Sequence, residues 1–133
     1  MTSGPALVSI LRQGAYLVAS VHTALDDSQM LRFQHDLIQR IGTERSRGVI
    51  IDVAALDVLD SFGTRTLSTI AEMARLRGAV TVIVGIQPDV ASAMVQLGMG
   101  TGSVATALDL EDGLALLDSR LATGRRALHG QPS

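Results

Sequence analysis

The sequence contains no cysteine, no lysine and no tryptophan, and its aromatic residues are one tyrosine and two phenylalanines. Without cysteine the chain forms no disulfide, no thiolate metal site and no cysteine nucleophile. Because all 11 basic residues are arginine, a phosphate-loop lysine and a Schiff-base lysine are also excluded. With so few aromatic side chains, we expect a core built from leucine, valine, isoleucine and alanine.

Charge and hydrophobicity narrow the classes of protein further. The formal net charge of −2 provides no broad basic surface for nucleic acid or for an anionic membrane. The 133 residues are 47% hydrophobic and 18% charged, which is typical of a single globular domain with its own core. We find neither a secretory signal pattern nor an apolar run of membrane length, so we expect a cytoplasmic protein.

Short apolar runs alternate with segments of helical periodicity. The runs predict strands at residues 7–11, 16–21, 48–53, 79–85 and 104–107. Predicted helices begin near Asp26, after Ser61, at Pro88 and after Asp109. We expect Gly42 to end the first helix, and residues 98–102 to form a flexible turn after the third.

The predicted order of elements is β-β-α-β-α-β-α-β-α. Strands that alternate with helices favour right-handed crossovers and a mainly parallel sheet, and the opening hairpin adds an antiparallel edge. The sequence therefore predicts an α/β fold with a mixed, mainly parallel sheet. We expect one domain over residues 5–122 and a flexible C-terminal tail over residues 123–133.

Ser61 lies where a buried strand and its loop give way to a helix. As the predicted N-cap, its hydroxyl would accept a hydrogen bond from the first turn. A phosphate on the same hydroxyl would face the N–H groups and the positive end of the helix dipole, while Asp57 and Asp60 would repel it. Position alone leaves open a structural cap and a phosphorylation site.

Other chemistry has little support in the sequence. Ser61 lacks the Gly-x-Ser-x-Gly context of a nucleophile elbow. His22, His35 and His129 are scattered and lack metal-ligand spacing. We therefore expect no catalytic residue, no metal and no cofactor.

A small enzyme or nucleotide binder is an alternative of a different class. Ligands of open α/β sheets bind beyond the carboxyl ends of the strands. In this chain Asp57, Asp60 and Gln87 would line such a site. The missing lysine and cysteine disfavour this alternative.

Three segments carry a resemblance to a known family. They are Ile51 to Phe62, which includes Asp60-Ser61-Phe62, then Gly85-Ile86-Gln87-Pro88, and Thr106 to Leu114. Together they resemble the STAS domain of bacterial anti-sigma-factor antagonists, over residues 7 to about 121. Phe62-Gly63-Thr64-Arg65 replaces the Gly-Leu stretch of the general antagonist pattern, and the Asp-Ser-Phe run is more similar to stressosome proteins. Because the pattern begins almost at Met1, we expect no sensory domain and a small subunit of the RsbS type.

The resemblance implies a non-catalytic scaffold and switch with Ser61 as the phosphoacceptor. Its implied partners are a sensor-bearing STAS paralogue, a serine/threonine switch kinase that leaves on phosphorylation, and a phosphatase, within a large self-associated complex. Neither nucleic acid nor membrane is an expected partner. We expect the partner surface to include Asp57, Asp60, Phe62, Thr64 and Arg65. The alternative within the family is a simple antagonist that binds an anti-sigma kinase without a stressosome.

Overall fold

The computed structural model describes residues 6–98 and 104–128, with side chains as far as residue 122. Two strands open the chain, and helices and strands then alternate as the sequence predicts. The elements are β1 (Val8–Gln13), β2 (Tyr16–Val21), α1 (Asp27–Glu44), β3 (Gly48–Asp52), α2 (Ser61–Leu76), β4 (Val80–Val84), α3 (Pro88–Gln96), β5 (Val104–Ala107) and α4 (Leu110–Leu128).

The five strands form one sheet in the order β1-β2-β3-β4-β5. β1 pairs antiparallel with β2, while β2, β3, β4 and β5 run parallel. This mixed sheet confirms the predicted α/β class and element order. Since parallel strands place their carboxyl ends at one edge, the loops that lead into the helices meet at that edge.

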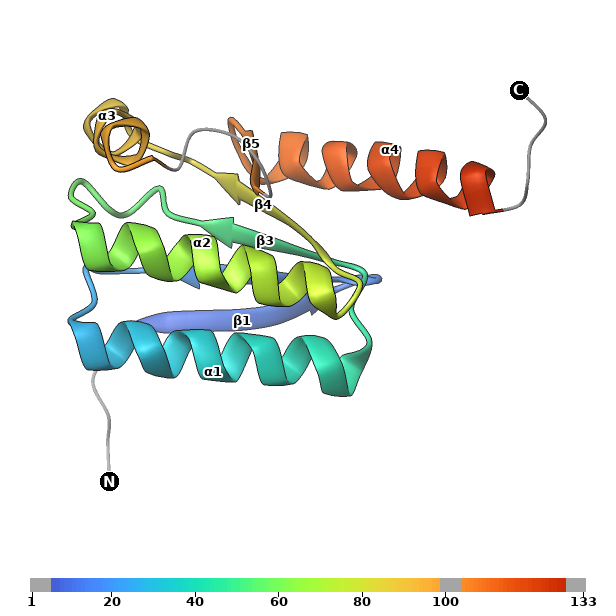
Figure 1. Ribbon diagram of the computed structural model, residues 1–133, viewed down its shortest axis with the longest axis horizontal. Helices are drawn as coiled ribbons and strands as arrows, with labels where there is room; N and C mark the ends of the chain where they lie inside the picture. Colours follow the sequence, from blue (N-terminus) through green and yellow to red (C-terminus); the bar gives the residue numbers. More distant parts are fainter. Residues whose placement is uncertain (1–5, 99–103, 129–133) are drawn as a thin grey trace.

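Helices α1 and α2 lie side by side across one face of the sheet, and α4 covers part of the other (Figure 1). The strand residues alternate between the two faces, as the period of two requires. In β2, Leu17 and Ala19 join the cluster under α1 and α2, whereas Tyr16 and Val18 join the cluster under α4.

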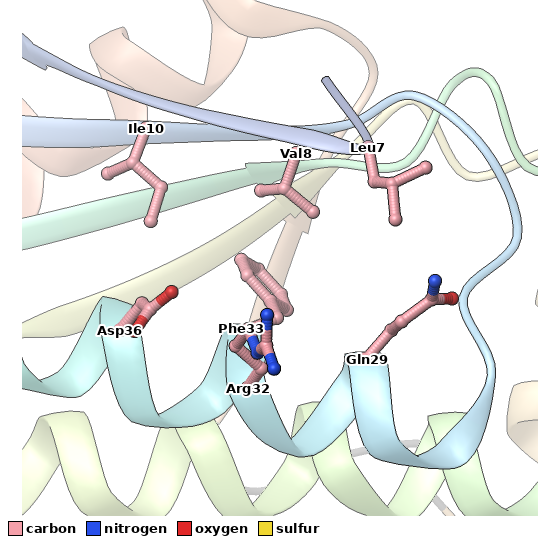
Figure 2. Close-up of a pocket in the computed structure, with 7 residues that line it drawn as sticks. All are labelled: Leu7, Val8, Ile10, Gln29, Arg32, Phe33 and Asp36. Atoms are coloured by element: carbon pink, nitrogen blue, oxygen red, sulfur yellow. The ribbon is translucent and has the colours of Figure 1, made fainter. Parts of the chain in front are cut away.

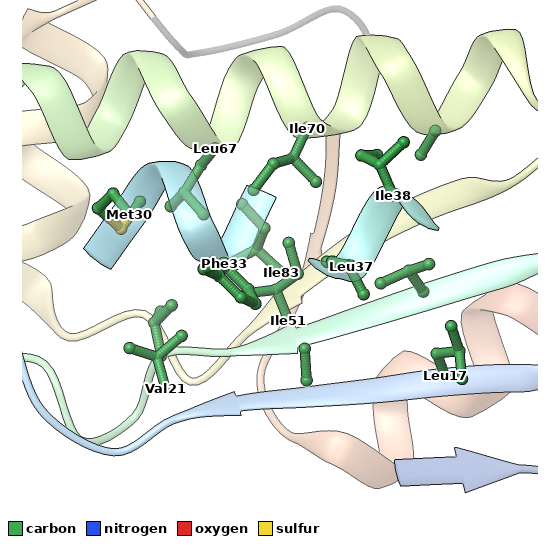
Figure 3. Close-up of a cluster of buried hydrophobic side chains, with 14 of the residues drawn as sticks. Leu17, Val21, Met30, Phe33, Leu37, Ile38, Ile51, Leu67, Ile70 and Ile83 are labelled. Carbon is green, nitrogen blue, oxygen red and sulfur yellow. The ribbon is translucent and has the colours of Figure 1, made fainter. Parts of the chain in front are cut away.

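Figure 3 shows the larger cluster, in which Phe33 and Leu37 of α1 meet Leu67 and Ile70 of α2 above the sheet. Phe33 is its one buried aromatic residue within the described ranges, and its other buried members are aliphatic residues and methionines. The core is therefore mainly aliphatic, as the composition predicts. It fixes α2 on the sheet and so positions the loop that precedes it.

One predicted helix boundary was wrong. Helix α1 passes through Gly42 and ends at Glu44, with Arg45 as the C-cap in the left-handed region at φ 52°. Gly42 lies beside the end of the Arg77 side chain, since a Cβ there would lie 2.5 Å from Nη1 of Arg77. Helix α4 continues to Leu128, and the division into a domain at residues 5–122 and a C-terminal tail at residues 123–133 stays a prediction. Most of the predicted turn at residues 98–102, and His129, lie outside the described residues.

None of the helices in the two described ranges has the length and apolar character needed to cross a membrane.

Candidate functional site at the start of helix α2

The loop between β3 and α2 is held by local hydrogen bonds. The carboxylate of Asp52 accepts a bond from the Ala54 N–H at 2.9 Å. The Val53 N–H donates to the Val84 carbonyl at 3.0 Å, and the Leu56 N–H donates to the Val53 carbonyl at 2.9 Å. Because Leu56 is buried in the core, the loop is fixed at its centre as well as at its first residues.

Asp60, and not Ser61, is the N-cap of α2. Its Oδ1 accepts a hydrogen bond from the Gly63 N–H at 2.7 Å, and its carbonyl accepts one from the Thr64 N–H at 2.9 Å. The prediction of Ser61 as the cap was therefore wrong by one residue. Aspartate caps a helix as well as serine does, so the cap falls on Asp60, the first residue of the pair, and the helix begins at Ser61.

Ser61 consequently occupies the first helical position with its side chain exposed. Within the described part of the chain, no residue makes a hydrogen bond to its hydroxyl. The hydroxyl oxygen is thus accessible and is not needed to close the helix.

Gly63 lets the preceding loop pack closely on the first turn of α2. A Cβ on Gly63 would lie 2.7 Å from Cδ1 of Leu59 and 3.2 Å from Oδ1 of Asp60. Leu59 in turn packs against the larger core cluster. The absent side chain at Gly63 therefore keeps both the Leu59 contact and the Asp60 cap in place.

The structure brings most of the predicted partner-binding residues to one surface, with one exception. Asp57, Asp60 and Arg65 are exposed around Ser61, and Phe62 is half-buried against the core. Thr64 is only 1% exposed, and among the described residues its hydroxyl has no hydrogen-bond partner. Thr64 therefore does not lie on the surface, because it falls on the side of α2 that faces the sheet.

The loop after β4 contacts the loop between β3 and α2 at Ala54. Gly85 has φ +77°, and a Cβ there would lie 2.8 Å from Cβ of Ala54. The Gln87 side-chain amide donates to the Ala54 carbonyl at 2.8 Å. Sequence reasoning placed Gln87 in a ligand site but missed this bond. A glycine directly after a strand was the available signal for such a close approach.

The histidines, which the sequence does not predict to be metal ligands, make ordinary contacts or are exposed in the described ranges. No group of three histidine, aspartate or glutamate residues in the described ranges could hold a metal ion. His22 pairs with Ser9 through Nε2 and Oγ at 3.0 Å, and His35 is exposed on α1.

A separate hollow of about 320 Å³ lies between β1 and α1. Figure 2 shows Leu7, Val8 and Ile10 above it and Phe33 of α1 below it. None of the residues predicted around Ser61 lines this hollow.

Comparisons with known proteins agree with this architecture. A family model described as the STAS domain matches residues 8–112. The structure of Moorella thermoacetica RsbS, in a variant that carries glutamate in place of a serine, is 35% identical. That match covers 88% of this chain and 99% of the RsbS chain, with a TM-score of 0.79.

Two further similarities involve the stressosome. A chain in a structure of the stressosome, described as a signal integration and transduction hub, is 32% identical with a TM-score of 0.71. The match covers 85% of this chain and 98% of that chain. The RsbT co-antagonist protein RsbRA of Bacillus subtilis (strain 168) is 29% identical over 90 residues, which are 68% of this chain. This chain matches only 33% of the length of RsbRA.

The family model covers most of the chain, and the match to RsbS extends over nearly the whole of that protein. The described fold has the strand and helix order predicted from the apolar runs and helical periodicity of the sequence. The chain therefore belongs to the STAS-domain family, and within that family it is similar to the stressosome subunit RsbS.

Proposed function

We propose that this chain is a non-catalytic scaffold and switch subunit of a stressosome, with Ser61 as its phosphoacceptor. The observation that carries the proposal is the division of roles between Asp60 and Ser61. Asp60 closes the helix, while the exposed Ser61 hydroxyl has no hydrogen-bond partner among the described residues. A kinase can modify such a hydroxyl without breaking the cap.

A phosphate at Ser61 would change the surface more than the fold. It adds about −1.5 to −2 charges and three acceptor oxygens. Exposed Asp57 and Asp60 would repel it, whereas the helix dipole would attract it. Arg65 is four residues further along the same helix, a spacing that places it near Ser61 on the helix surface. The guanidinium makes no ion pair within the described residues and is available to the phosphate.

The proposed role of this surface is to hold a serine/threonine switch kinase until Ser61 is phosphorylated. Added charge at an interface costs free energy when the partner offers no cation to match it. The kinase would then dissociate and act elsewhere, and a phosphatase would restore the binding surface. The similarity to RsbS, RsbRA and a stressosome chain supports co-assembly with sensor-bearing STAS paralogues.

The first test is phosphate mapping after incubation with the cognate switch kinase and Mg-ATP. We expect phosphate on Ser61 and none in Ser61→Ala. Ser28→Ala is the matched control, because Ser28 is also exposed in the first turn of a helix but bonds to its N-cap, Asp26, at 2.9 Å. An unmodified Ser61, with the kinase active on another substrate, would contradict the proposal.

Kinase binding and particle size test the remaining parts. We expect Ser61→Ala to retain the kinase after treatment with ATP, and Ser61→Glu to bind it more weakly. Equal kinase affinity before and after full phosphorylation of Ser61 would refute the release step. With a STAS paralogue the chain should form a very large particle, whereas the simple antagonist would remain a small complex.

A further inference from the structure

A second charged surface lies at the opposite end of the sheet from Ser61. Arg45 caps the C-terminus of α1, Arg77 caps that of α2, and Arg47 directly precedes β3. All three line one open hollow of about 600 Å³. Figure 1 shows α1 and α2 running together from the Ser61 end to this end.

The three guanidinium groups are not neutralised within the described part of the chain. Its ion pairs join Arg12 and Arg40 to Glu44, and Arg75 to Glu72. Arg45, Arg47 and Arg77 take part in none of these pairs, and none donates a side-chain hydrogen bond. This hollow therefore presents three cations that are available to an external anion.

The backbone that carries these cations is fixed. The Ser46 hydroxyl donates to the Gly48 carbonyl at 2.6 Å, and the Arg47 N–H donates to the Ala15 carbonyl at 3.1 Å. The Arg47 carbonyl accepts from the Val80 N–H at 3.1 Å. Gly42 leaves the space that Nη1 of Arg77 occupies. A fixed backbone reduces the entropy lost when the arginines bind a partner.

Helix dipoles explain only part of this cluster. A cation near the C-terminus of a helix interacts favourably with the helix dipole. This explains Arg45 at the end of α1 and Arg77 at the end of α2, but it does not explain why the two lie in one hollow. Arg47 precedes strand β3, so no helix dipole stabilises its charge. Gly42 lies inside α1, where glycine lowers helix stability, so helix stability does not explain the glycine beside the Arg77 guanidinium.

The carboxyl edge of the sheet carries the complementary charge. Asp57, Asp60 and Asp89 are exposed along that edge, and Val58 adds an apolar side chain that is 66% exposed. The basic end has its own exposed apolar side chain in Leu76, at 77%. Each end thus offers charges and an apolar contact that fit the other end.

We propose that the hollow lined by Arg45, Arg47 and Arg77 binds the acidic edge around Asp57 and Asp60 of a second copy of this chain. The contact is head-to-tail, so a pair of copies retains one free acidic edge, on one copy, and one free basic hollow, on the other, and chains or rings result. The inference rests on the self-association in the proposed function, but it requires no phosphorylation. The same edge is the proposed kinase surface, so a second copy and the kinase would compete for it. A phosphate on Ser61 would add negative charge to the acidic edge and favour the second copy.

The test is sedimentation velocity on the unmodified full chain over a concentration series, at low and at high salt. We expect wild type to self-associate, and the assemblies to dissociate as salt screens the charges. Arg47→Gln with Arg77→Gln should weaken self-association by about tenfold or more. Arg32→Gln with Arg120→Gln removes the same charge from exposed positions outside the hollow and should leave association unchanged.

A mixing experiment identifies the head-to-tail arrangement. Asp57→Asn with Asp60→Asn removes two charges while asparagine still caps α2. This variant and Arg47→Gln/Arg77→Gln should each be monomeric alone, and together they should form a 1:1 dimer and nothing larger. A wild type that stays monomeric, or a mixture that does not dimerise, overturns the inference. Since no kinase is present, these results are independent of whether Ser61 is a phosphoacceptor.

Discussion

Helices α1 and α2 begin at the same edge of the sheet, but their first turns are closed differently. At α1, Asp26 and Gln29 form a reciprocal capping box, with bonds of 2.8 Å in both directions, and Ser28 donates a third bond to Asp26. At α2, Asp60 accepts one bond from Gly63, which has no side chain to return it.

The difference separates a helix start whose serine is bonded into the cap from one whose serine hydroxyl is exposed and has no hydrogen-bond partner among the described residues. In α1 the polar side chains at the helix start bond to one another, and the Ser28 hydroxyl donates its hydrogen bond to the cap residue Asp26. In α2 the cap is complete without Ser61, whose hydroxyl faces solvent. We infer that Gly63, at the third helical position, lets Leu59 pack closely on the first turn of α2 and lets Asp60 close the helix without the Ser61 hydroxyl.

The largest expected effect comes from placing a side chain at Gly63. Gly63→Val should destabilise the domain by about 1–3 kcal/mol, because the new atoms displace Leu59 and crowd the Asp60 cap. Urea unfolding measures the change in the free energy of unfolding. Gly42→Ala is the control, since only the end of the flexible Arg77 side chain need move. Equal destabilisation of both variants would show that Gly63 has no special packing role.

Removing the single cap of α2 should have the next largest effect. Asp60→Ala should cost about 1 kcal/mol, because the Gly63 N–H loses its only side-chain acceptor. Asp60→Asn keeps an oxygen in the same place and should cost much less. If both variants unfold at the same urea concentration as wild type, Asp60 is not the effective cap.

A smaller, pH-dependent effect is expected at α1. The hydrogen bond from the Gln29 backbone, with that from Ser28, holds the pKa of Asp26 below its ordinary value of 3.8. Folding thus favours the carboxylate, so its stabilisation is fully present above 3.8 and is lost as pH falls through the lower, folded-state pKa. An NMR titration should place the Asp26 midpoint below 3.8, and Ser28→Ala should raise it. A midpoint at or above 3.8 would contradict the capping geometry.

The smallest effect on stability is expected at Ser61. Ser61→Ala should change the free energy of unfolding by less than about 0.5 kcal/mol, as for an exposed residue without partners. Thermal or urea unfolding beside Ser28→Ala tests the contrast, because Ser28 loses a bond to Asp26. A loss of 1 kcal/mol or more at Ser61 would mean that its hydroxyl supports the helix after all.

Much of the fold was predictable because the signals are local. Apolar runs marked all five strands, Pro88 marked the start of α3, and Asp109 caps α4 through the Asp112 N–H at 2.9 Å. The end of α1 was predicted at Gly42 instead of Glu44, because the sequence does not distinguish a glycine inside a helix from one just after its end. Only the neighbouring Arg77 distinguishes them.

The candidate site was predictable in outline for the same reason. The Asp-Ser pair after a buried strand predicted a helix start with an accessible serine, and the exposed Asp57 and Arg65 lie beside it. The burial of Thr64 was not foreseen, because it depends on which side of α2 faces the sheet. The bond from Gln87 to the Ala54 carbonyl joins residues that are 33 positions apart.

The sequence alone determined the class of fold, the order of the elements and the aliphatic nature of the core, since hydrophobic periodicity and composition act through near neighbours. Tertiary structure decided which residue of the Asp-Ser pair caps α2, which side chains around it are exposed, and which arginines gather at the opposite end. Those outcomes depend on contacts between segments far apart in the chain, and such contacts leave no periodic trace in the sequence.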